Sequence, residues 1–314
     1  MQDNARKITY GAMMVAIFVI LLAVSFYIPF VGSVVLFFIP LPIILYRLRY
    51  DRISAFLMML VGFTLSLLIG GIVLLPIAVA FGLLGFVIGD TMSLEKTKLY
   101  TFMASGLTFL IIMIVTYVST VIFLGINIIE ELMKSLRGTQ EQMTSLMAKY
   151  GELPENFSGQ MEESISLYET AIPSTFIIAA FSFSFIIVIL NSMIVNRLGH
   201  NVPKFPPFRD MKVPGIAVWA YLVILILPWI VNVEQGSTLN LTYVNATIIF
   251  RFLFLIQGIS LIHYYMSEKK LPTWVTVIST VSALLLSPAT VLLGILDSGM
   301  NIRAWIGKDK GKGN

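Results

Sequence analysis

The chain has 314 residues, of which 57% are hydrophobic and only 12% are charged, and its formal net charge is +4. A soluble domain carries about 25% charged residues, and a globule of this length cannot bury so much apolar surface in one core. This composition excludes a disordered chain, a secreted disulfide scaffold and a cytosolic enzyme, and it predicts a membrane protein. The absence of Cys excludes disulfides and thiolate metal sites.

Nine apolar stretches follow one another along the chain. A bilayer core of about 30 Å needs roughly 20 residues of helix to cross it. The stretches lie near 8–28, 30–46, 53–69, 71–89, 100–126, 173–195, 213–233, 244–266 and 273–296. The first is predicted to be an uncleaved anchor, because its apolar run exceeds the about 7–15 residues of a signal peptide and no A-x-A site follows.

The basic residues of the short connections all fall on one side. If every stretch crosses, that side holds 13 Lys and Arg residues, while the connections near 29–30, 70–71 and 234–243 hold none. Basic short loops stay in the cytoplasm, so the N-terminus is predicted to be cytoplasmic. The positive net charge thus reflects membrane topology, and no nucleic-acid partner is expected.

Pro288 interrupts the last stretch, and a proline inside a helix removes a backbone donor and bends or breaks the helix. Nine crossings would place the basic tail, with Arg303, Lys308, Lys310 and Lys312, outside. The two pieces on either side of Pro288, about 14 and 9 residues long, also suit a re-entrant hairpin that returns the tail to the cytoplasm. Eight full spans with a broken ninth and nine true spans both stay open.

Residues 127–172 form the only sizeable aqueous segment and carry eight acidic and three basic residues. Apolar residues recur there on one face of a helix, at Ile129, Leu132, Met133, Leu136, Met143, Leu146, Met147 and Tyr150. Gly151, Pro154 and Ser158 interrupt this pattern before a shorter stripe begins. An extracytoplasmic amphipathic helical hairpin is predicted, which is either a solvated connector, a lid over an outward-facing site or a docking surface.

Motifs of soluble catalysis are absent from the sequence. There is no phosphate-binding loop, no H-E-x-x-H, no G-x-S-x-G, and only two His, at positions 200 and 263. Two separate histidines without nearby intramembrane carboxylates do not build a metal site. We therefore expect no enzyme, no metal and no cofactor.

Arg251 is the charged residue inside the eighth apolar stretch. A charge in the bilayer costs several kcal/mol unless it is paired or meets water, so it is a functional candidate. Thr247 and Gly258 share its helical face. One interpretation is a binding site for a small polar or anionic molecule at Arg251, Thr247 and Gly258. The other is that Arg251 reaches the outer interface or bonds to a broken helix end.

Two stripes of small residues have helical spacing, which lets membrane helices approach closely. In the fourth stretch the stripe is Ala78, Gly82, Gly85 and Gly89, and we expect it to pack helices within the chain. In the first stretch Ala12 and Ala16 either pack internally or contact a partner helix.

The inner loop between the sixth and seventh stretches is rich in proline and basic residues, and its prolines keep it from being helical throughout. Its candidate functional residues are Pro203, Pro206, Pro207, Phe208 and Arg209. In one interpretation Phe205 and Phe208 lie at the headgroup level, with Lys204, Arg209 and Lys212 toward anionic lipid. In the other, the loop binds a cytoplasmic protein.

The proline-rich loop and the closing segment LGILDSGMNIR, with Gly294, Asp297, Asn301 and Arg303, resemble the YybS-like family of bacterial membrane proteins. The resemblance covers the whole chain and implies a multi-pass protein of the bacterial cell membrane. It brings no catalytic residues, because that family is uncharacterised. Asn301 stands where an acid is expected, which argues against a paired acidic site.

The first six stretches also look like the substrate-binding S component of an energy-coupling-factor transporter. This resemblance rests on ITYGAMMVAIFVILL, where Ala12 and Ala16 match the small residues that contact the membrane coupling subunit, and on PLPIILYRLRYDRISAFLMMLVGFTLSLLIGG. The chain departs from that pattern in its very short first outer loop, its acidic hairpin and its three extra segments, so no vitamin pocket is transferred.

These observations predict an all-α, polytopic membrane bundle of 8–9 transmembrane helices. Residues 1–195, with the hairpin 127–172, form a six-helix domain, 196–212 the cytoplasmic loop, and 213–314 a C-terminal membrane module with a basic tail. The expected function is a small-molecule binding or transport component without its own ATPase. The alternative is a scaffold or regulator that binds a protein. Expected partners are the lipid bilayer, a small-molecule ligand, and a coupling subunit or another protein.

Overall fold

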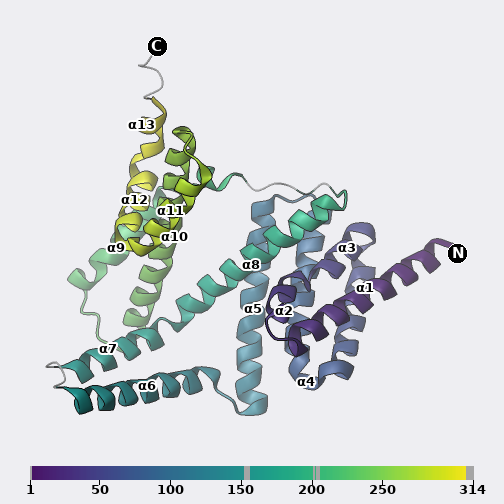
Figure 1. Ribbon diagram of the computed structural model, residues 1–314, viewed down its shortest axis with the longest axis horizontal. Coiled ribbons are helices and arrows are strands. Elements are labelled where there is room, and N and C mark those ends of the chain that lie inside the picture. The colour runs from purple at the N-terminus through teal and green to yellow at the C-terminus, as the bar shows by residue number, and fades with distance from the viewer. Residues whose placement is uncertain (1, 152–155, 201, 203–205, 309–314) are drawn as a thin grey trace. The chain divides into compact units, whose positions relative to one another are not determined.

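The computed structural model describes residues 2–151, 156–200, 202 and 206–308. Every regular element within these residues is a helix (Figure 1), which confirms the all-α prediction. The chain divides into a front unit, Met1–Glu131 with Ala179–Lys204, and a rear unit, Leu132–Ile178 with Phe205–Asn314. The hairpin residues from 132 onward thus belong with the C-terminal helices, whereas the sequence had suggested the front domain.

The front unit begins with one long helix and a segmented one. They are α1 (Gln2–Tyr27), then α2 (Val31–Val35), the 3₁₀ helix η1 (Leu36–Phe38) and α3 (Leu41–Arg49). Pro40 is the N-cap of α3 and Pro42 lies in its first turn, where a proline N–H is not needed. The span Val31–Arg49 that contains these three pieces has 19 residues and is apolar enough to cross a membrane, as the second predicted crossing requires.

α4 (Arg52–Ser93) has 42 residues, and as a straight helix it would be about 63 Å long, twice the thickness of a bilayer core. Gly71 has φ 61 and ψ −156, a conformation that glycine adopts without steric cost, and the chain reverses there. Arg52 Nη2 therefore lies 3.4 Å from Asp90 Oδ2, although a straight helix would put the two residues about 57 Å apart. The predicted stretches on either side of Gly71 are two antiparallel arms.

The small-residue stripe on the second arm of α4 faces inward. All four of its members are buried: Ala78, Gly82, Gly85 and Gly89. A Cβ atom at Gly85 would lie 2.7 Å from the Pro40 carbonyl, and one at Gly89 would lie 2.9 Å from the Arg47 side chain. The stripe therefore allows α3 and the second arm of α4 to pack backbone against backbone.

α5 (Lys98–Leu124) and α8 (Ile172–Arg197) complete the front unit. Residues of α8 from 179 onward belong to this unit. Ser184 donates through Oγ to the carbonyl of Ser105 at 3.3 Å, so the two helices contact through small polar residues. Phenylalanine rings fill the remaining space, with Phe109 and Phe183 stacked at 5.4 Å between ring centroids.

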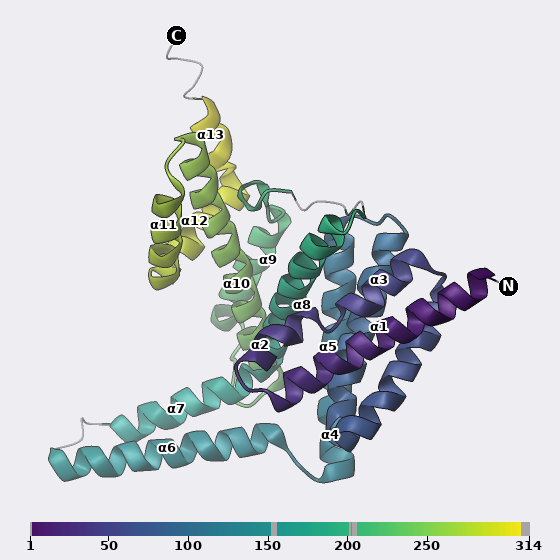
Figure 2. The same cartoon turned by 45° about the vertical axis from the view of Figure 1, so that its right-hand side comes forward.

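The acidic segment forms two helices, α6 (Ile128–Tyr150) and α7 (Phe157–Thr170), which lie side by side in both views (Figures 1 and 2). Arg137 lies 4.0 Å from the carboxylates of Glu162 and Glu169 and links the two helices. Pro154, one of the predicted breaks, lies outside the described residues. The helical hairpin is present, and its extracytoplasmic side stays a prediction.

The rear unit has its core between α9 (Ile216–Ile230), α10 (Thr238–Glu268) and the C-terminal helices. The buried apolar residues of this core are Val213, Val218, Tyr221, Phe254 and Val291. Nearer the beginning of α10, the side-chain oxygen of Asn245 accepts from the backbone N–H of Ser174 at 2.7 Å. This bond ties the beginning of α8 to the rear unit.

The last apolar stretch is two helices, α11 (Thr273–Leu285) and α12 (Ser287–Met300), which are bent by 104° at Leu286. Pro288 lies in the first turn of α12, so the predicted interruption is confirmed. A Cβ atom at Gly258 would collide with the Thr290 carbonyl, and one at Gly294 with the Phe254 carbonyl. α12 thus crosses the middle of α10 in close contact, and α11 with α12 reaches only about halfway along α10.

Within the described residues, six helices are long and apolar enough to cross a membrane, or seven if the bent pair is counted as one span. α4 enters this count once although it folds back on itself, and α9 has only 15 residues. A helical membrane bundle is confirmed. The number of 8–9 crossings and the cytoplasmic N-terminus stay predictions.

Candidate functional site

The end of α12 brings a carboxylate and a guanidinium together. Asn301 ends this helix in the left-handed conformation (φ 52, ψ 56), which Asn tolerates better than most residues, and α13 (Ile302–Lys308) then starts in a new direction. This break lets Arg303 Nε donate to Asp297 Oδ2 at 2.9 Å. The side chains are only 4% and 0% exposed, so the ion pair is shielded from water.

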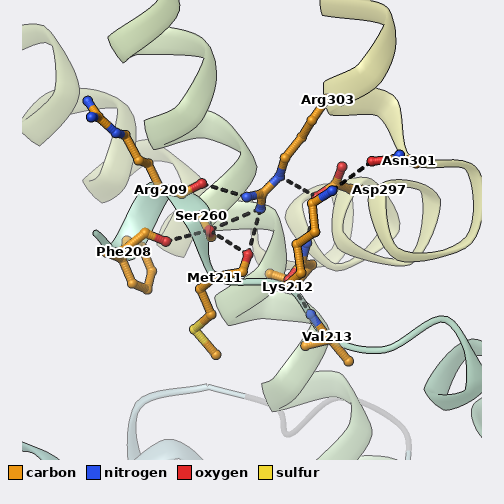
Figure 3. A network of polar contacts seen from close by, with 10 residues as sticks. Phe208, Arg209, Met211, Lys212, Val213, Ser260, Asp297, Asn301 and Arg303 are labelled. Atoms are coloured by element: carbon orange, nitrogen blue, oxygen red, sulfur yellow. Dashed lines mark hydrogen bonds and ion pairs between the residues drawn. The ribbon is translucent and has the colours of Figure 1, made fainter. Parts of the chain in front are cut away.

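The guanidinium of Arg303 also holds the loop that precedes α9 (Figure 3). Nη1 donates to the carbonyl of Arg209 at 2.5 Å, and Nη2 donates to the carbonyl of Met211 at 2.8 Å. Ser260 of α10 lies between Arg303 and the loop: its Oγ is 3.0 Å from Arg303 Nη2 and donates to the carbonyl of Phe208 at 2.6 Å. The proline-rich loop cannot satisfy these carbonyls with helical hydrogen bonds, and Arg303 and Ser260 supply the donors.

Gln257 joins the loop to the carboxylate. It is fully buried in α10, its Oε1 accepts from the backbone N–H of Val213 at 2.9 Å, and its Nε2 donates to Asp297 Oδ2 at 2.5 Å. Oδ2 therefore receives two donors, one from Gln257 and one from Arg303. The bonds tie three distant parts of the sequence into one network.

The second oxygen of the same carboxylate has a different environment. Among the described residues, Asp297 Oδ1 and Ser298 Oγ have no hydrogen-bond partner, although both atoms are buried. Both residues line a cavity of about 240 Å³, which we call the Asp297 cavity. Lys212 also lines it and donates through Nζ to Asn301 Oδ1 at 2.8 Å.

The Asp297 cavity combines an acceptor, a hydroxyl group and an ammonium group. Arg303 neutralises Asp297, so the charge of Lys212 remains uncompensated by this carboxylate. An ammonium group has three donors, and the structure records one of them in use. The cavity is suited to a small polar molecule that donates to Asp297 Oδ1 and accepts from Lys212. In the described part of the chain, no group of three His, Asp or Glu residues is placed to hold a metal ion.

A second buried ion cluster lies in the front unit and has a different character. Arg47 Nε donates to Asp90 Oδ1 at 3.0 Å, and Arg52 Nη2 lies 3.4 Å from Asp90 Oδ2. Arg47 Nη1 also donates to Ser93 Oγ at 2.9 Å. Both carboxylate oxygens of Asp90 have partners, so this cluster fastens α3 to both arms of α4 and offers no free group to a ligand.

The residues proposed from the eighth stretch occupy different environments on α10. Arg251 is exposed, and within the described residues the structure records no hydrogen bond or ion pair for its guanidinium. Thr247 Oγ1 is buried and has no partner among those residues. Gly258 is buried against Thr290 of α12, which is a packing role. A ligand at Arg251 stays a prediction.

The other predicted residues are placed as follows. Ala12 and Ala16 are exposed on α1, so this small face is open in the chain, and its partner stays a prediction. Pro206, Pro207 and the 3₁₀ turn η2 (Phe208–Asp210) are exposed, and the backbone carbonyls of this turn, rather than its prolines, take part in the Arg303 network. Pro203, Lys204, Phe205, Lys310 and Lys312 lie outside the described residues.

The network is formed by residues that were not predicted as site residues: Lys212, Gln257, Ser260, Asp297 and Arg303. A signal was present for two of them, because Gln257 and Ser260 are polar residues in an apolar stretch. Asp297 and Arg303 were noted as part of the closing segment, and Arg303 also as a basic residue of the tail. The proline-rich loop and the closing segment, which carried the family resemblance, are the two parts that Arg303 joins.

Comparison with known proteins gives a family match and one curated relative. The model of the family described as "Predicted membrane protein (DUF2232)" matches residues 16–298. The chain is 28% identical over 306 residues to the uncharacterized protein YybS of Bacillus subtilis (strain 168), covering 96% of this chain and 98% of the relative. No solved structure matches, and the likeness of the front half to an S component stays a prediction.

Proposed function

The chain belongs to the DUF2232 family of predicted membrane proteins, and from this premise we propose that it is a membrane component that binds a small polar molecule in the Asp297 cavity. The sequence contains no phosphate-binding loop, so active transport of that molecule would need an energising partner. The exposed face of α1 at Ala12 and Ala16 is the surface that we assign to such a partner.

The observation that carries this proposal is the unpartnered oxygen Asp297 Oδ1. A buried acceptor without a hydrogen bond costs about 1–3 kcal/mol, and a fold retains such a cost where a ligand relieves it. The carboxylate cannot turn away, because Arg303 and Gln257 hold its other oxygen. Oδ1 is therefore a fixed acceptor in the wall of the cavity.

The cavity also limits the size and the chemistry of the ligand. Its volume of about 240 Å³ is below the roughly 300–1,000 Å³ typical of sites for drug-sized ligands. A small metabolite with an amine or hydroxyl donor and an acceptor for Lys212 fits these limits. A vitamin-sized ligand does not.

Thermal unfolding of the full-length protein in detergent, with a panel of small polar metabolites, tests this function. A ligand at 100 times its Kd stabilises the protein by about 2.7 kcal/mol. We expect Ser298→Ala and Lys212→Gln to weaken this effect while the protein stays folded, because neither residue belongs to the Arg303 contacts. If both variants keep the full stabilisation by the ligand, the ligand does not bind in the Asp297 cavity. If only Arg251→Ala loses this stabilisation, the binding site is at Arg251.

A scaffold is the second candidate, and the exposed stripe of α6 favours it. Leu132, Met143, Leu146 and Met147 are 37–55% exposed, whereas Met133 is 8% exposed. Such an apolar stripe suits the helix of a partner protein. Co-purification from native membranes separates the two functions: Leu146→Asp should release a protein partner of a scaffold, and it should leave metabolite binding unchanged.

A further inference from the structure

A second cavity, of about 460 Å³, lies where the proline-rich loop, the end of α10 and the beginning of α11 meet. Its wall includes Phe208, Arg209, His263, Thr276 and Thr280. None of these side chains lines the Asp297 cavity. The second cavity is therefore a separate feature of the rear unit, and a ligand bound in it would occupy a different site from the molecule assigned to the Asp297 cavity.

Arg209 supplies the charge of this cavity. Its side chain donates through Nη1 to Ser267 Oγ, which holds the guanidinium against the end of α10. A guanidinium has five N–H donors, and the structure records this one in use, so further donors are free for a ligand. Lys269 and Lys270 follow on the same helix end and are exposed. Arg209 is the charged side chain among the residues that line the cavity.

Hydroxyl and imidazole groups extend the polar wall. Thr280 donates its single hydroxyl proton to the carbonyl of Thr276 at 2.8 Å. His263 Nε2 lies 2.8 Å from the hydroxyl oxygen of Thr280, and because the Thr280 proton is donated to Thr276, Nε2 acts as the donor in that contact. Thr280 thus fixes the ring of His263, and the edge-to-face contact with Phe208 at 5.2 Å holds it from the other side.

The remaining wall is apolar and continues onto the surface of α11. Leu271 and Val277 line the cavity. Beyond it, Trp274, Ile278 and Val281 on α11 are 53–65% exposed. A helix with an uncovered apolar face, in a family of membrane proteins, presents that face to hydrocarbon. A basic polar pocket thus opens directly beside a lipid-facing surface.

We propose that this cavity binds the phosphate group of an anionic phospholipid, whose acyl chains lie along α11. Guanidinium groups bind phosphate through charge-assisted hydrogen bonds, and the hydroxyls of Thr273 and Thr276, which also line the cavity, provide further donors. A neutral polar ligand would leave the charge of Arg209 uncompensated, and a free soluble anion would make no use of the apolar face. The lipid uses both.

The test is thermal unfolding of the full-length protein in neutral detergent with added phosphatidylglycerol, phosphatidylcholine or inorganic phosphate. We expect phosphatidylglycerol to raise the unfolding temperature most. For Arg209→Gln, roughly tenfold more phosphatidylglycerol should be needed to give the same rise in unfolding temperature, because one charge-assisted contact is lost. Arg209→Gln leaves the backbone carbonyl that Arg303 binds intact, so the protein should still fold.

Arg197→Gln is the matched control, because Arg197 is exposed at the end of α8 and its substitution removes the same charge away from the cavity. It should respond to phosphatidylglycerol like the natural protein. Equal loss in both variants would reveal a general charge effect and overturn the proposal. Equal stabilisation by phosphatidylcholine would overturn the anionic requirement, and equal stabilisation by inorganic phosphate would overturn the assignment to lipid. Thr276→Val, which keeps every charge, should weaken the lipid effect as well.

Discussion

At Asp297 the two oxygens of one carboxylate have different surroundings. Oδ2 receives donors from Arg303 and Gln257, while Oδ1 is buried without a partner among the described residues, in a side chain that lines the cavity. The other buried acid of those residues, Asp90, has partners on both oxygens. The contrast separates an ion pair that only fastens helices from one that also holds an acceptor in place.

Removing Arg303 tests how strongly this network supports the rear unit. Loss of one partner of a buried ion pair costs about 3–5 kcal/mol, because it leaves an uncompensated buried charge. We expect Arg303→Met to lower the free energy of unfolding by about this amount, and Asp297→Leu combined with Arg303→Met to restore part of it. Thermal unfolding of single and double variants in one detergent measures both effects. A cost in Arg303→Met no larger than that of Arg197→Met would contradict this role.

Asp51 makes the stability of the front unit depend on pH in the acidic range. Its carboxylate accepts from Lys7 Nζ and from the backbone N–H and hydroxyl of Ser54, and these hydrogen bonds, above all that from Lys7, lower its pKa well below the usual range. A pKa lowered by folding stabilises the fold above the unfolded value of about 4, and this contribution is lost as the pH falls through the folded value.

The natural protein should therefore lose stability below about pH 4 more steeply than Asp51→Asn, which keeps a good helix cap. Between pH 7 and about pH 5 the two unfolding curves should run parallel. The difference should also shrink at high salt, because both side chains are partly exposed. Unfolding temperatures across this pH range provide the measurement, and parallel curves throughout would exclude the contribution of Asp51.

At the scale of elements, glycines decide which helices approach closely. α10 and α12 cross where Gly258 faces the Thr290 carbonyl and Gly294 faces the Phe254 carbonyl. The neighbouring atoms are backbone, which cannot move aside as a flexible side chain can. This close crossing brings Gln257 within reach of Asp297, so the network of polar residues depends on the small ones.

Gly258→Ala and Gly294→Ala should each destabilise the protein by about 1–3 kcal/mol, the usual cost of overpacking. Gly138→Ala is the matched control, because Gly138 lies in α6 with nothing near its missing Cβ atom. That substitution should instead stabilise its helix by roughly 0.5–1 kcal/mol. Thermal unfolding compares all three, and an equal sign for all of them would refute the packing argument.

For the whole molecule, periodicity and composition predict the helices well and the polar network poorly. The length of each apolar stretch locates the membrane helices. Pro288 and Gly71 mark breaks in them, because proline and glycine change the backbone at their own positions. The site depends instead on contacts between residues that are far apart in sequence, such as Gln257 with Asp297. Arg251 stood out because it is charged within an apolar stretch, whereas Arg303 looked like an ordinary tail residue until the turn at Asn301 directed it inward.

These long-range contacts favour one of the two topologies left open by the sequence. Arg303 bonds to the carbonyls of Arg209 and Met211, so the end of α12 lies beside the loop that precedes α9. α10, with 31 residues, is about 46 Å long and separates that loop from the connection between α9 and α10. The broken segment formed by α11 and α12 is therefore expected to return to the side on which it entered, as a re-entrant hairpin does.

Because the chain has no Cys, single cysteines can test this topology with a membrane-impermeant thiol reagent. Asp210→Cys in the loop, Ala304→Cys in α13 and Gln235→Cys between α9 and α10 are all at exposed positions. The charge distribution predicts that the loop is cytoplasmic, so intact cells should be labelled at 235 only, and inverted vesicles at 210 and 304. Labelling of 304 together with 235 in intact cells would show nine true spans. It would also place Arg303 on the opposite side of the membrane from the loop carbonyls that it binds in the structure.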